Sequence, residues 1–227
     1  MYYFDSTFLL LIPGILLALY AQFKVKSAFE KASKMMSRSG LSSTQAAELI
    51  LRSHVPYNVE IKPVNGMLTD HYNPANKTLG LSEGVYNNRS LAAIGIAAHE
   101  AGHAIQDAEG YAPLKLRSAV VPVVQISSNL SPLIIMAGFL FNFSFLIHLG
   151  IIFFAATVLF SLITLPVEFD ATRRAKQLLV EDGHIDAAER KVVDSVLDAA
   201  ALTYVAALVN GLLQLLRLIL IARRRND

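Results

Sequence analysis

The 227-residue sequence has no cysteine and no tryptophan, and only 17% of its residues are charged. Without cysteine the chain cannot form disulfides, thiolate metal sites or a cysteine nucleophile. Its 12 glycines and 8 prolines are too few for a collagen-like or low-complexity chain, and its net charge of +2 provides no broad basic surface for nucleic acid. Hydrophobic residues, in contrast, make up 54% of the chain, which excludes a disordered chain and exceeds the usual content of a soluble domain. The composition indicates a membrane protein.

Two stretches without charged residues are long enough to cross a bilayer. Residues 6–23 suffice for one crossing, which needs about 20 residues. This stretch has no basic flank before it and no small-residue cleavage site after it, so it is expected to remain as an anchor. Residues 118–167 contain no Asp, Glu, Lys or Arg, and this length predicts two crossings joined by a turn near 141–144.

A third apolar stretch, 199–222, predicts either a full span or a helix lying along the membrane surface. Lysine and arginine gather at 24–38 and again at 173–191, and the positive-inside rule puts both clusters on the cytoplasmic side. A final span would leave the three arginines that follow residue 222 on the outside, against that rule. The polar residues of this stretch are Asn210, Gln214 and Arg217.

These patterns predict a mainly α-helical integral membrane protein with about four hydrophobic helices and a small β element. We divide it into residues 1–23, an N-terminal transmembrane helix; 24–117, a polar region on the cytoplasmic side; 118–167, a transmembrane hairpin; 168–198, a polar helix with a connecting helix; and 199–227, a C-terminal hydrophobic helix with a basic tail. Within the polar region we expect a helix at 43–52, strands at 59–64 and 77–82, a turn at 70–74, and a helix from an N-cap at Ser90 to about residue 108.

The last of these helices carries His99-Glu-Ala-Gly-His103, an H-E-x-x-H sequence. Residues four apart lie on one helix face, so both imidazoles can reach one zinc ion. Glu100 is turned about 100° from His99, so it is better placed to act as a general base than as a ligand. The flanking residues are small and apolar, which predicts a buried helix whose polar side chains need partners. We therefore interpret the motif as a zinc site rather than as an ordinary helix with two histidines.

Two glutamates are candidates for the third ligand. Glu109 is the weaker one, because the extended H-E-x-x-H-x-x-G-x-x-H pattern needs a glycine where this chain has Gln106. Glu168 is expected to open a helix over 167–182 and to lie on its apolar stripe, where an acidic side chain calls for a counter-ion. Two membrane crossings separate the motif from Glu168, which leaves both on the same side. The sequence favours Glu168 and keeps Glu109 as the alternative.

Three weaker candidates surround the motif. His71, in the expected turn, is a candidate contact for substrate or oxyanion, or else an ordinary surface residue. Asp107 lies four residues after His103 and could orient its imidazole. The strand expected at 77–82 precedes the motif helix and could pair with an extended substrate backbone.

The chain resembles the YugP-type membrane zinc metallopeptidases of bacteria over nearly its whole length. This resemblance implies that His99, His103 and Glu168 bind Zn²⁺ and that Glu100 is the catalytic base. The layout is also similar to that of HtpX-type and CAAX-prenyl endopeptidases, which carry an acidic residue four positions after the ligand glutamate. Here Thr172 stands at that position, and the nearest acid, at 170, is expected to face the other way. The stretches that carry the resemblance are LTDHYNP at 68–74, LSEGVY at 81–86, AAHEAGHAIQ at 97–106 and LPVEFDATRRA at 165–175.

We therefore expect a zincin-like zinc endopeptidase in the bacterial inner membrane, multi-pass, with its active site facing the cytoplasm. Zinc would activate a water molecule, and Glu100 would accept the proton of that water. The expected partners are the lipid bilayer and a polypeptide substrate, which could itself be a membrane protein, and not nucleic acid. The alternative is a zinc-stabilised membrane scaffold or regulator without turnover.

Overall fold

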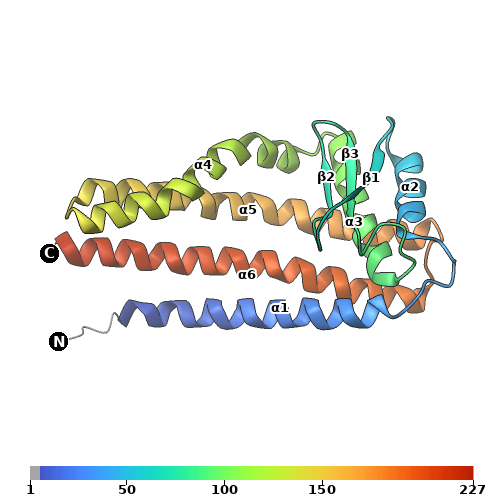
Figure 1. Cartoon of the computed structure of the whole chain (residues 1–227), viewed down its shortest axis with the longest axis horizontal. Helices are drawn as coiled ribbons and strands as arrows, with labels where there is room; N and C mark the ends of the chain where they lie inside the picture. The colour runs from blue at the N-terminus through green and yellow to red at the C-terminus, as the bar shows by residue number, and fades with distance from the viewer. Residues whose placement is uncertain (1–5, 227) are drawn as a thin grey trace. The chain divides into compact units, whose positions relative to one another are not determined.

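The structure, a computed structural model, describes residues 6–226 and is mainly helical with one small sheet (Figure 1). The chain forms two compact units. The apolar unit contains the described residues up to Ala21, Leu116–Leu165 and the chain from Thr203; the motif unit contains Gln22–Lys115 and Pro166–Leu202. The elements are η1 (Ser6–Leu11), α1 (Ile12–Ser33), α2 (Ser43–His54), β1 (Glu60–Val64), β2 (His71–Asn73), β3 (Thr78–Ser82), α3 (Leu91–Ala108), α4 (Ala112–Leu140), α5 (Ser144–Glu181) and α6 (Ala187–Asn226).

Within residues 6–226, four helical segments are long and apolar enough to cross a membrane, which agrees with the expected number of hydrophobic helices. The turn expected near 141–144 is also confirmed, because α4 ends at Leu140 and α5 begins at Ser144, with Asn142 in the left-handed region at a φ of 54°. Residues 1–5 of the expected first span lie outside the described residues. The four segments are Thr7–Ser33, Ala112–Leu140, Ser144–Glu181 and Ala187–Arg224.

The helices α5 and α6 are longer than the sequence pattern predicts. No separate helix begins at residue 167, because α5 continues through Pro166 as one helix of 38 residues. Proline removes one backbone hydrogen bond but can be accommodated where neighbouring helices support the chain. At 1.5 Å per residue, α5 is about 57 Å long, roughly twice the hydrocarbon core of a bilayer. It therefore contributes residues to both units, as does α6, which passes residue 199 without a break.

Within the apolar unit, small residues let α4 and α5 approach closely. A side chain added at Gly138 would collide with Ile147, and one added at Gly150 would collide with Ile135. The hydroxyl of Ser131 donates to the carbonyl oxygen of Gly150 at 2.8 Å. Close backbone approach at small residues, joined by a hydroxyl hydrogen bond, is how helices associate in a solvent that offers no hydrophobic driving force.

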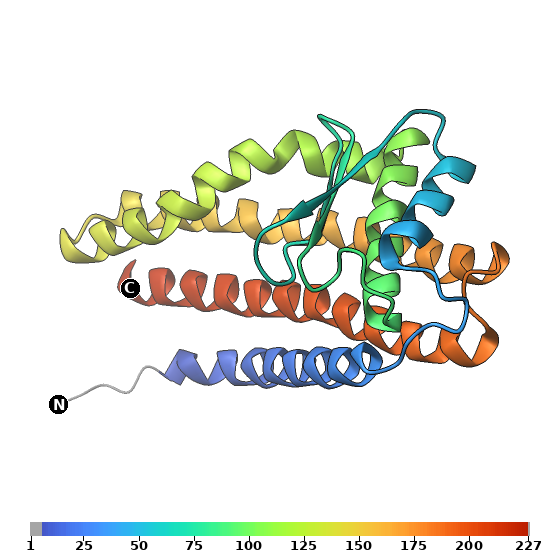
Figure 2. The same ribbon diagram turned by 45° about the vertical axis from the view of Figure 1, so that its right-hand side comes forward.

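The motif unit contains the small sheet and the helices α2 and α3, which lie side by side and share a hydrophobic core (Figures 1 and 2). The helix α2 begins with a capping box, in which Ser42 accepts from the backbone N–H of Gln45 and the Gln45 side chain accepts from the backbone N–H of Ser42. The strands have the order β1-β3-β2, with β1 parallel and β2 antiparallel to β3. The central strand β3 is almost entirely buried, and β2 packs against α3.

Two expectations about the strands need correction. The segment expected as a turn at 70–74 contains the strand β2, because Tyr72 pairs with Leu79 of β3 and Asp70 accepts from the backbone N–H and hydroxyl of Ser82. Turn-forming residues lose their local preference when a neighbouring strand offers hydrogen bonds. The strand at 78–82 is the central strand, paired with β1 along its whole length and with β2 at 78–80, so it is not the edge strand that would most readily accept a substrate backbone.

Candidate metal centre

The helix α3 begins where the sequence predicts. The hydroxyl of Ser90 accepts from the backbone N–H of Ala93, and the helix ends at Ala108, shortly before Gly110 in the left-handed region. His99 and His103 lie one turn apart, with ring centroids separated by 4.8 Å and the rings nearly perpendicular. Glu100 as a residue is buried, with 8% of its surface exposed. Local helix geometry therefore sets the two imidazoles on one face.

The helix α5 brings Glu168 to these imidazoles. The two helices touch at Gly102, where an added side chain would lie 2.8 Å from the carbonyl oxygen of Ala171. Glycine is therefore required for this approach, and Ala171 follows Glu168 by less than one turn. Glu168 is only 1% exposed, as its position on the apolar stripe of the helix predicts.

The three side chains form the one group in residues 6–226 whose arrangement could hold a metal ion, with all ligand atoms within 4.8 Å of one another. The Oε2 atom of Glu168 lies 3.2 Å from Nε2 of His99 and 3.6 Å from Nε2 of His103. Zinc bonds of about 2.0–2.1 Å at tetrahedral angles put neighbouring ligand atoms roughly 3.3 Å apart. The donor set and its spacing therefore fit a zinc ion bound by two histidines and one glutamate.

Acidic groups dominate the electrostatics around the imidazoles. Burial lowers the pKa of His103, but Glu168 and Glu100 together outweigh this and raise it above its ordinary value. No side chain within residues 6–226 hydrogen-bonds to the carboxyl group of Glu100. A buried negative environment is costly unless a cation offsets it, so the local field favours a bound cation.

The Nδ1 atoms on the far side of each ring have partners of their own. Nδ1 of His103 lies 3.0 Å from Oε1 of Gln106, and Nδ1 of His99 lies 3.3 Å from the hydroxyl of Thr172. Metal-bound histidines generally use their second nitrogen in this way, which fixes the ring. Both Nε2 atoms are thereby left facing Glu168.

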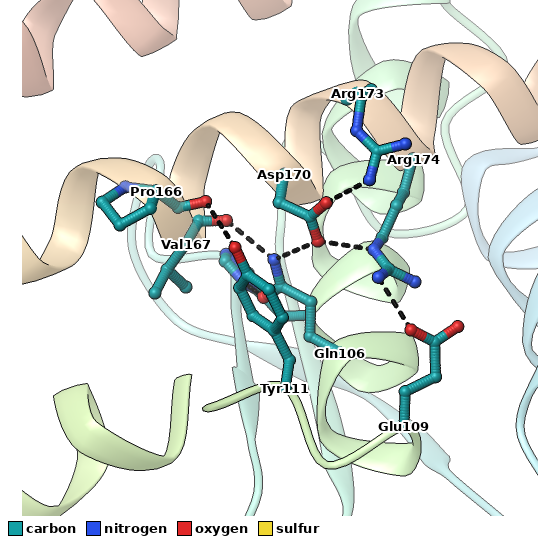
Figure 3. Close-up of polar contacts among 9 residues, drawn as sticks. Gln106, Glu109, Tyr111, Pro166, Val167, Asp170, Arg173 and Arg174 are labelled. Atoms are coloured by element: carbon teal, nitrogen blue, oxygen red, sulfur yellow. Dashed lines mark hydrogen bonds and ion pairs between the residues drawn. The ribbon is translucent and has the colours of Figure 1, made fainter. Parts of the chain in front are cut away.

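Two expectations about the residues behind the rings are wrong. Asp107 does not orient His103, because Gln106 occupies that position. Asp170 does not point away from the site, because its Oδ2 atom accepts from the Gln106 amide at 3.0 Å (Figure 3). A helical sequence alone does not indicate which neighbour on α3 meets an acceptor on α5, and no signal in it singled out Gln106.

Asp107 instead joins the sheet to the motif helix. Its Oδ2 atom accepts from the hydroxyls of Tyr57 and Tyr72, at 2.9 and 2.7 Å, and from Nζ of Lys77 at 2.5 Å. Burial raises the pKa of Asp107, but these three donors outweigh that effect and hold it below its ordinary value. The cluster fixes β2 and the start of β3 against the end of α3.

The other candidates lie outside the metal-binding group. Glu109, the alternative ligand, pairs with Arg174 at 2.7 Å, and this ion pair lowers the pKa of Glu109. His71 is exposed on β2, with Nδ1 2.8 Å from the carbonyl oxygen of Thr69.

With this geometry established, comparison with known proteins is informative. Residues 7–223 match the family described as "putative neutral zinc metallopeptidase". The chain belongs to this family. It is also 49% identical, over 218 residues, to the "Putative membrane protease YugP" of Bacillus subtilis (strain 168), with 96% of this chain and 97% of that relative covered. No solved structure gives a significant match. Membership of this family agrees with the resemblance found in the sequence, and the family name implies zinc as the metal.

Proposed function

We propose that this chain is a membrane-embedded zinc endopeptidase that hydrolyses peptide bonds at or near the cytoplasmic surface of the bacterial cell membrane. One observation carries the proposal: His99, His103 and Glu168 converge from two helices, next to the buried carboxyl group of Glu100. Three protein ligands and a nearby base are typical of catalytic zinc sites, which keep one coordination position open.

The residues of the chain have separate tasks in this proposal. His99, His103 and Glu168 would hold Zn²⁺, which when bound supplies a Lewis acid that polarises the substrate carbonyl and acidifies a water molecule. Glu100 accepts the proton from the attacking water at its carboxylate and returns it to the departing amine nitrogen. The low exposure of Glu100 limits the access of bulk water to that proton.

The substrate backbone would lie along β2 rather than along the central strand β3. We infer a zincin-like core in which the outer edge of β2, an edge strand beside α3, accepts an extended peptide through main-chain hydrogen bonds. His71 is exposed on this strand and would contact the substrate or its oxyanion. On this proposal His71→Ala slows peptide cleavage and leaves the zinc content unchanged.

The membrane arrangement is part of the same proposal. Lysines and arginines cluster at 24–38, over the last turns of α1 and the segment that follows it, and towards the ends of α5 and α6 that belong to the motif unit, and such clusters favour the cytoplasmic side. We infer that the polar regions at 24–117 and 168–198 face the cytoplasm and that 1–23, 118–167 and 199–227 supply the transmembrane helices. A site close to the bilayer would suit polypeptide substrates that include membrane proteins.

The decisive experiment measures zinc per chain in detergent-purified protein by elemental mass spectrometry. Wild type should carry close to one zinc, Glu168→Ala should lose most of it, and Glu109→Ala, the matched control, should retain it. Loss of zinc in the control instead would transfer the third-ligand role to Glu109. Wild-type protein without zinc or another transition metal would overturn the metallopeptidase proposal.

A second experiment separates an enzyme from a zinc-stabilised scaffold or regulator. Glu100→Gln keeps the size of the side chain and removes the base, so zinc should stay bound while cleavage of an unfolded model protein such as casein stops. A variant that cleaves at the wild-type rate would exclude Glu100 as the base. Zinc-loaded wild type that cleaves no peptide bond would favour the scaffold.

A further inference from the structure

The side chain of Gln106 is completely buried between the motif helix and α5 (Figure 3). Its amide makes three hydrogen bonds: Oε1 lies 3.0 Å from Nδ1 of His103, and Nε2 donates to the carbonyl oxygen of Val167 at 2.8 Å and to Oδ2 of Asp170 at 3.0 Å. All its polar atoms are therefore used, and one of its partners is a candidate metal ligand.

The partners of Gln106 allow only one orientation of the amide. A backbone carbonyl and a carboxylate accept hydrogen bonds and cannot donate them, so the amide nitrogen must face Val167 and Asp170. The reversed amide would set its oxygen against two acceptor oxygens and lose both of these hydrogen bonds, each of which contributes about 0.5–1.5 kcal/mol and more where the acceptor is charged. The amide oxygen is consequently fixed toward His103.

This orientation determines the protonation pattern of the imidazole. An amide oxygen can only accept, so Nδ1 of His103 must carry the proton, and the neutral ring then has its lone pair on Nε2. Nε2 is the atom that faces Glu168, at 3.6 Å. His99 lacks such a constraint, because the hydroxyl of Thr172 can either donate or accept.

Two arginines keep the other end of this chain of hydrogen bonds in place. Arg173 and Arg174 both donate to the carboxylate of Asp170, and Nε of Arg174 lies 2.6 Å from its Oδ2 atom (Figure 3). Arg174 also pairs with Glu109 at 2.7 Å. These donors hold Asp170 as an acceptor for the Gln106 amide.

We propose that Asp170 and Gln106 are positioning residues that lock His103 in the tautomer able to bind metal through Nε2. The proposed role of this lock in metal binding rests on the proposed zinc site, whereas the hydrogen bonds that form the lock are present without the ion. Removing Gln106 should weaken zinc binding about 10- to 100-fold, the usual effect of losing the partner of a metal-bound histidine. Removing Asp170 should weaken it less, because Val167 still accepts from the amide.

The test compares Gln106→Met, which keeps the side-chain length and loses both hydrogen-bonding groups, with Asp170→Ala and with Glu109→Gln as a matched control. Glu109 belongs to the same network but is exposed and does not contact the amide. Zinc dissociation constants, measured by competition with a chromophoric chelator in detergent, should rise for the first two variants and remain within twofold of wild type for the control. Zinc affinity of Gln106→Met within twofold of wild type would overturn the proposal.

A rescue variant distinguishes tautomer control from simple loss of packing. In the double variant Asp170→Ala with Gln106→Glu, the introduced carboxyl group has two equivalent oxygens, so one accepts from the Nδ1–H of His103 in either orientation. The other oxygen, when protonated, donates to the carbonyl oxygen of Val167 as the amide does. The double variant should restore the zinc affinity lost in Asp170→Ala. Failure of the rescue would show that Asp170 acts only through packing.

The tautomer can also be observed directly in zinc-free protein by NMR of ¹⁵N-labelled histidine, with the His103 signals assigned from their absence in His103→Gln. Because acidic neighbours raise the pKa of His103, the spectra are recorded at a pH high enough that the ring is neutral. In wild type Nε2 of His103 should then show the shift of an unprotonated nitrogen, and in Gln106→Met it should move toward that of a protonated one. An unchanged spectrum refutes the tautomer lock. This readout does not use zinc, so it separates failure of the lock from failure of the proposed zinc enzyme.

Discussion

Replacing Gly102 by alanine tests whether the contact between α3 and α5 sets the geometry of the candidate metal centre. The added methyl group would lie 2.8 Å from the carbonyl oxygen and 3.3 Å from Cα of Ala171, whereas ordinary contacts begin at 3.4 Å. Both obstacles are backbone atoms, which cannot rotate away. The two helices must therefore separate by about 0.5 Å, and Glu168 moves away from the two histidines.

The structure allows the magnitude to be estimated. Overpacking of this kind costs about 1–3 kcal/mol, and the better helix propensity of alanine offsets about 1 kcal/mol of that, so we expect a net loss of stability of about 0–2 kcal/mol. Zinc binding should suffer more, because a shift of about 0.5 Å exceeds the tolerance of roughly 0.2 Å on metal–ligand distances. We expect zinc affinity to fall at least about tenfold, by the usual sensitivity of metal sites to misplaced neighbours.

The control is Gly95→Ala on the same helix. There the added methyl group would lie 3.0 Å from one methyl carbon of Val193, which is a side-chain atom of α6 and not the backbone of α5. The assay measures zinc affinity by chelator competition and thermal unfolding with and without zinc. The control should bind zinc like wild type and unfold at the same or a higher temperature. If Gly102→Ala matches the control in both measurements, the close approach of the helices does not position the ligands.

Three further outcomes are expected. Ser90→Ala removes the N-cap of the motif helix and should cost about 1 kcal/mol in chemical denaturation; a loss below about 0.3 kcal/mol would show that the cap does not matter. Asp107→Asn weakens the cluster that joins the sheet to α3 and should lower the unfolding temperature near neutral pH. The difference from wild type should shrink as the pH falls below the ordinary carboxyl range, because a carboxyl group with a lowered pKa stabilises the fold only while it is ionised. A difference independent of pH would refute this. Burial lowers the pKa of His184, and Asp182 opposes this only partly. The contribution of the neutral imidazole to the free energy of unfolding is therefore complete above the ordinary histidine pKa and is lost on acidification. His184→Gln should flatten the decline in stability between about pH 7 and 5, and stability curves of variant and wild type that run parallel with pH would contradict this.

Local rules explain why the sequence predicted much of this protein. The spacing of His99 and His103 is a property of any α-helix, so their common face follows from the motif alone. The N-cap at Ser90 and the turn between α4 and α5 were equally accessible, because capping and turn formation depend on a few adjacent residues. Long apolar runs predict long apolar helices, since the hydrophobic core of a bilayer sets a minimum length.

Features that depend on residues distant in the sequence could not be predicted from such local rules. The strand β2 exists because β3 provides hydrogen bonds for residues whose own preference is a turn. The helix α5 continues through Pro166, although proline removes a backbone hydrogen bond and the local sequence pattern predicts a helix start after it. The sequence indicated that Glu168 is buried, but its distance from the histidines follows from the contact between Gly102 and Ala171.

The choice between Gln106 and Asp107 illustrates this division most clearly. Both follow His103 at helical spacings that reach the same region, and the sequence offered Asp107 only as a weaker candidate for orienting the imidazole. The tertiary structure decides otherwise, because α5 offers the carbonyl of Val167 and the carboxylate of Asp170 to an amide, whereas the sheet offers three donors to a carboxylate. The sequence by itself determined which side chains can bind a metal, and only the folded chain determined which neighbours hold them, because a hydrogen bond between distant segments depends on both partners and on their separation.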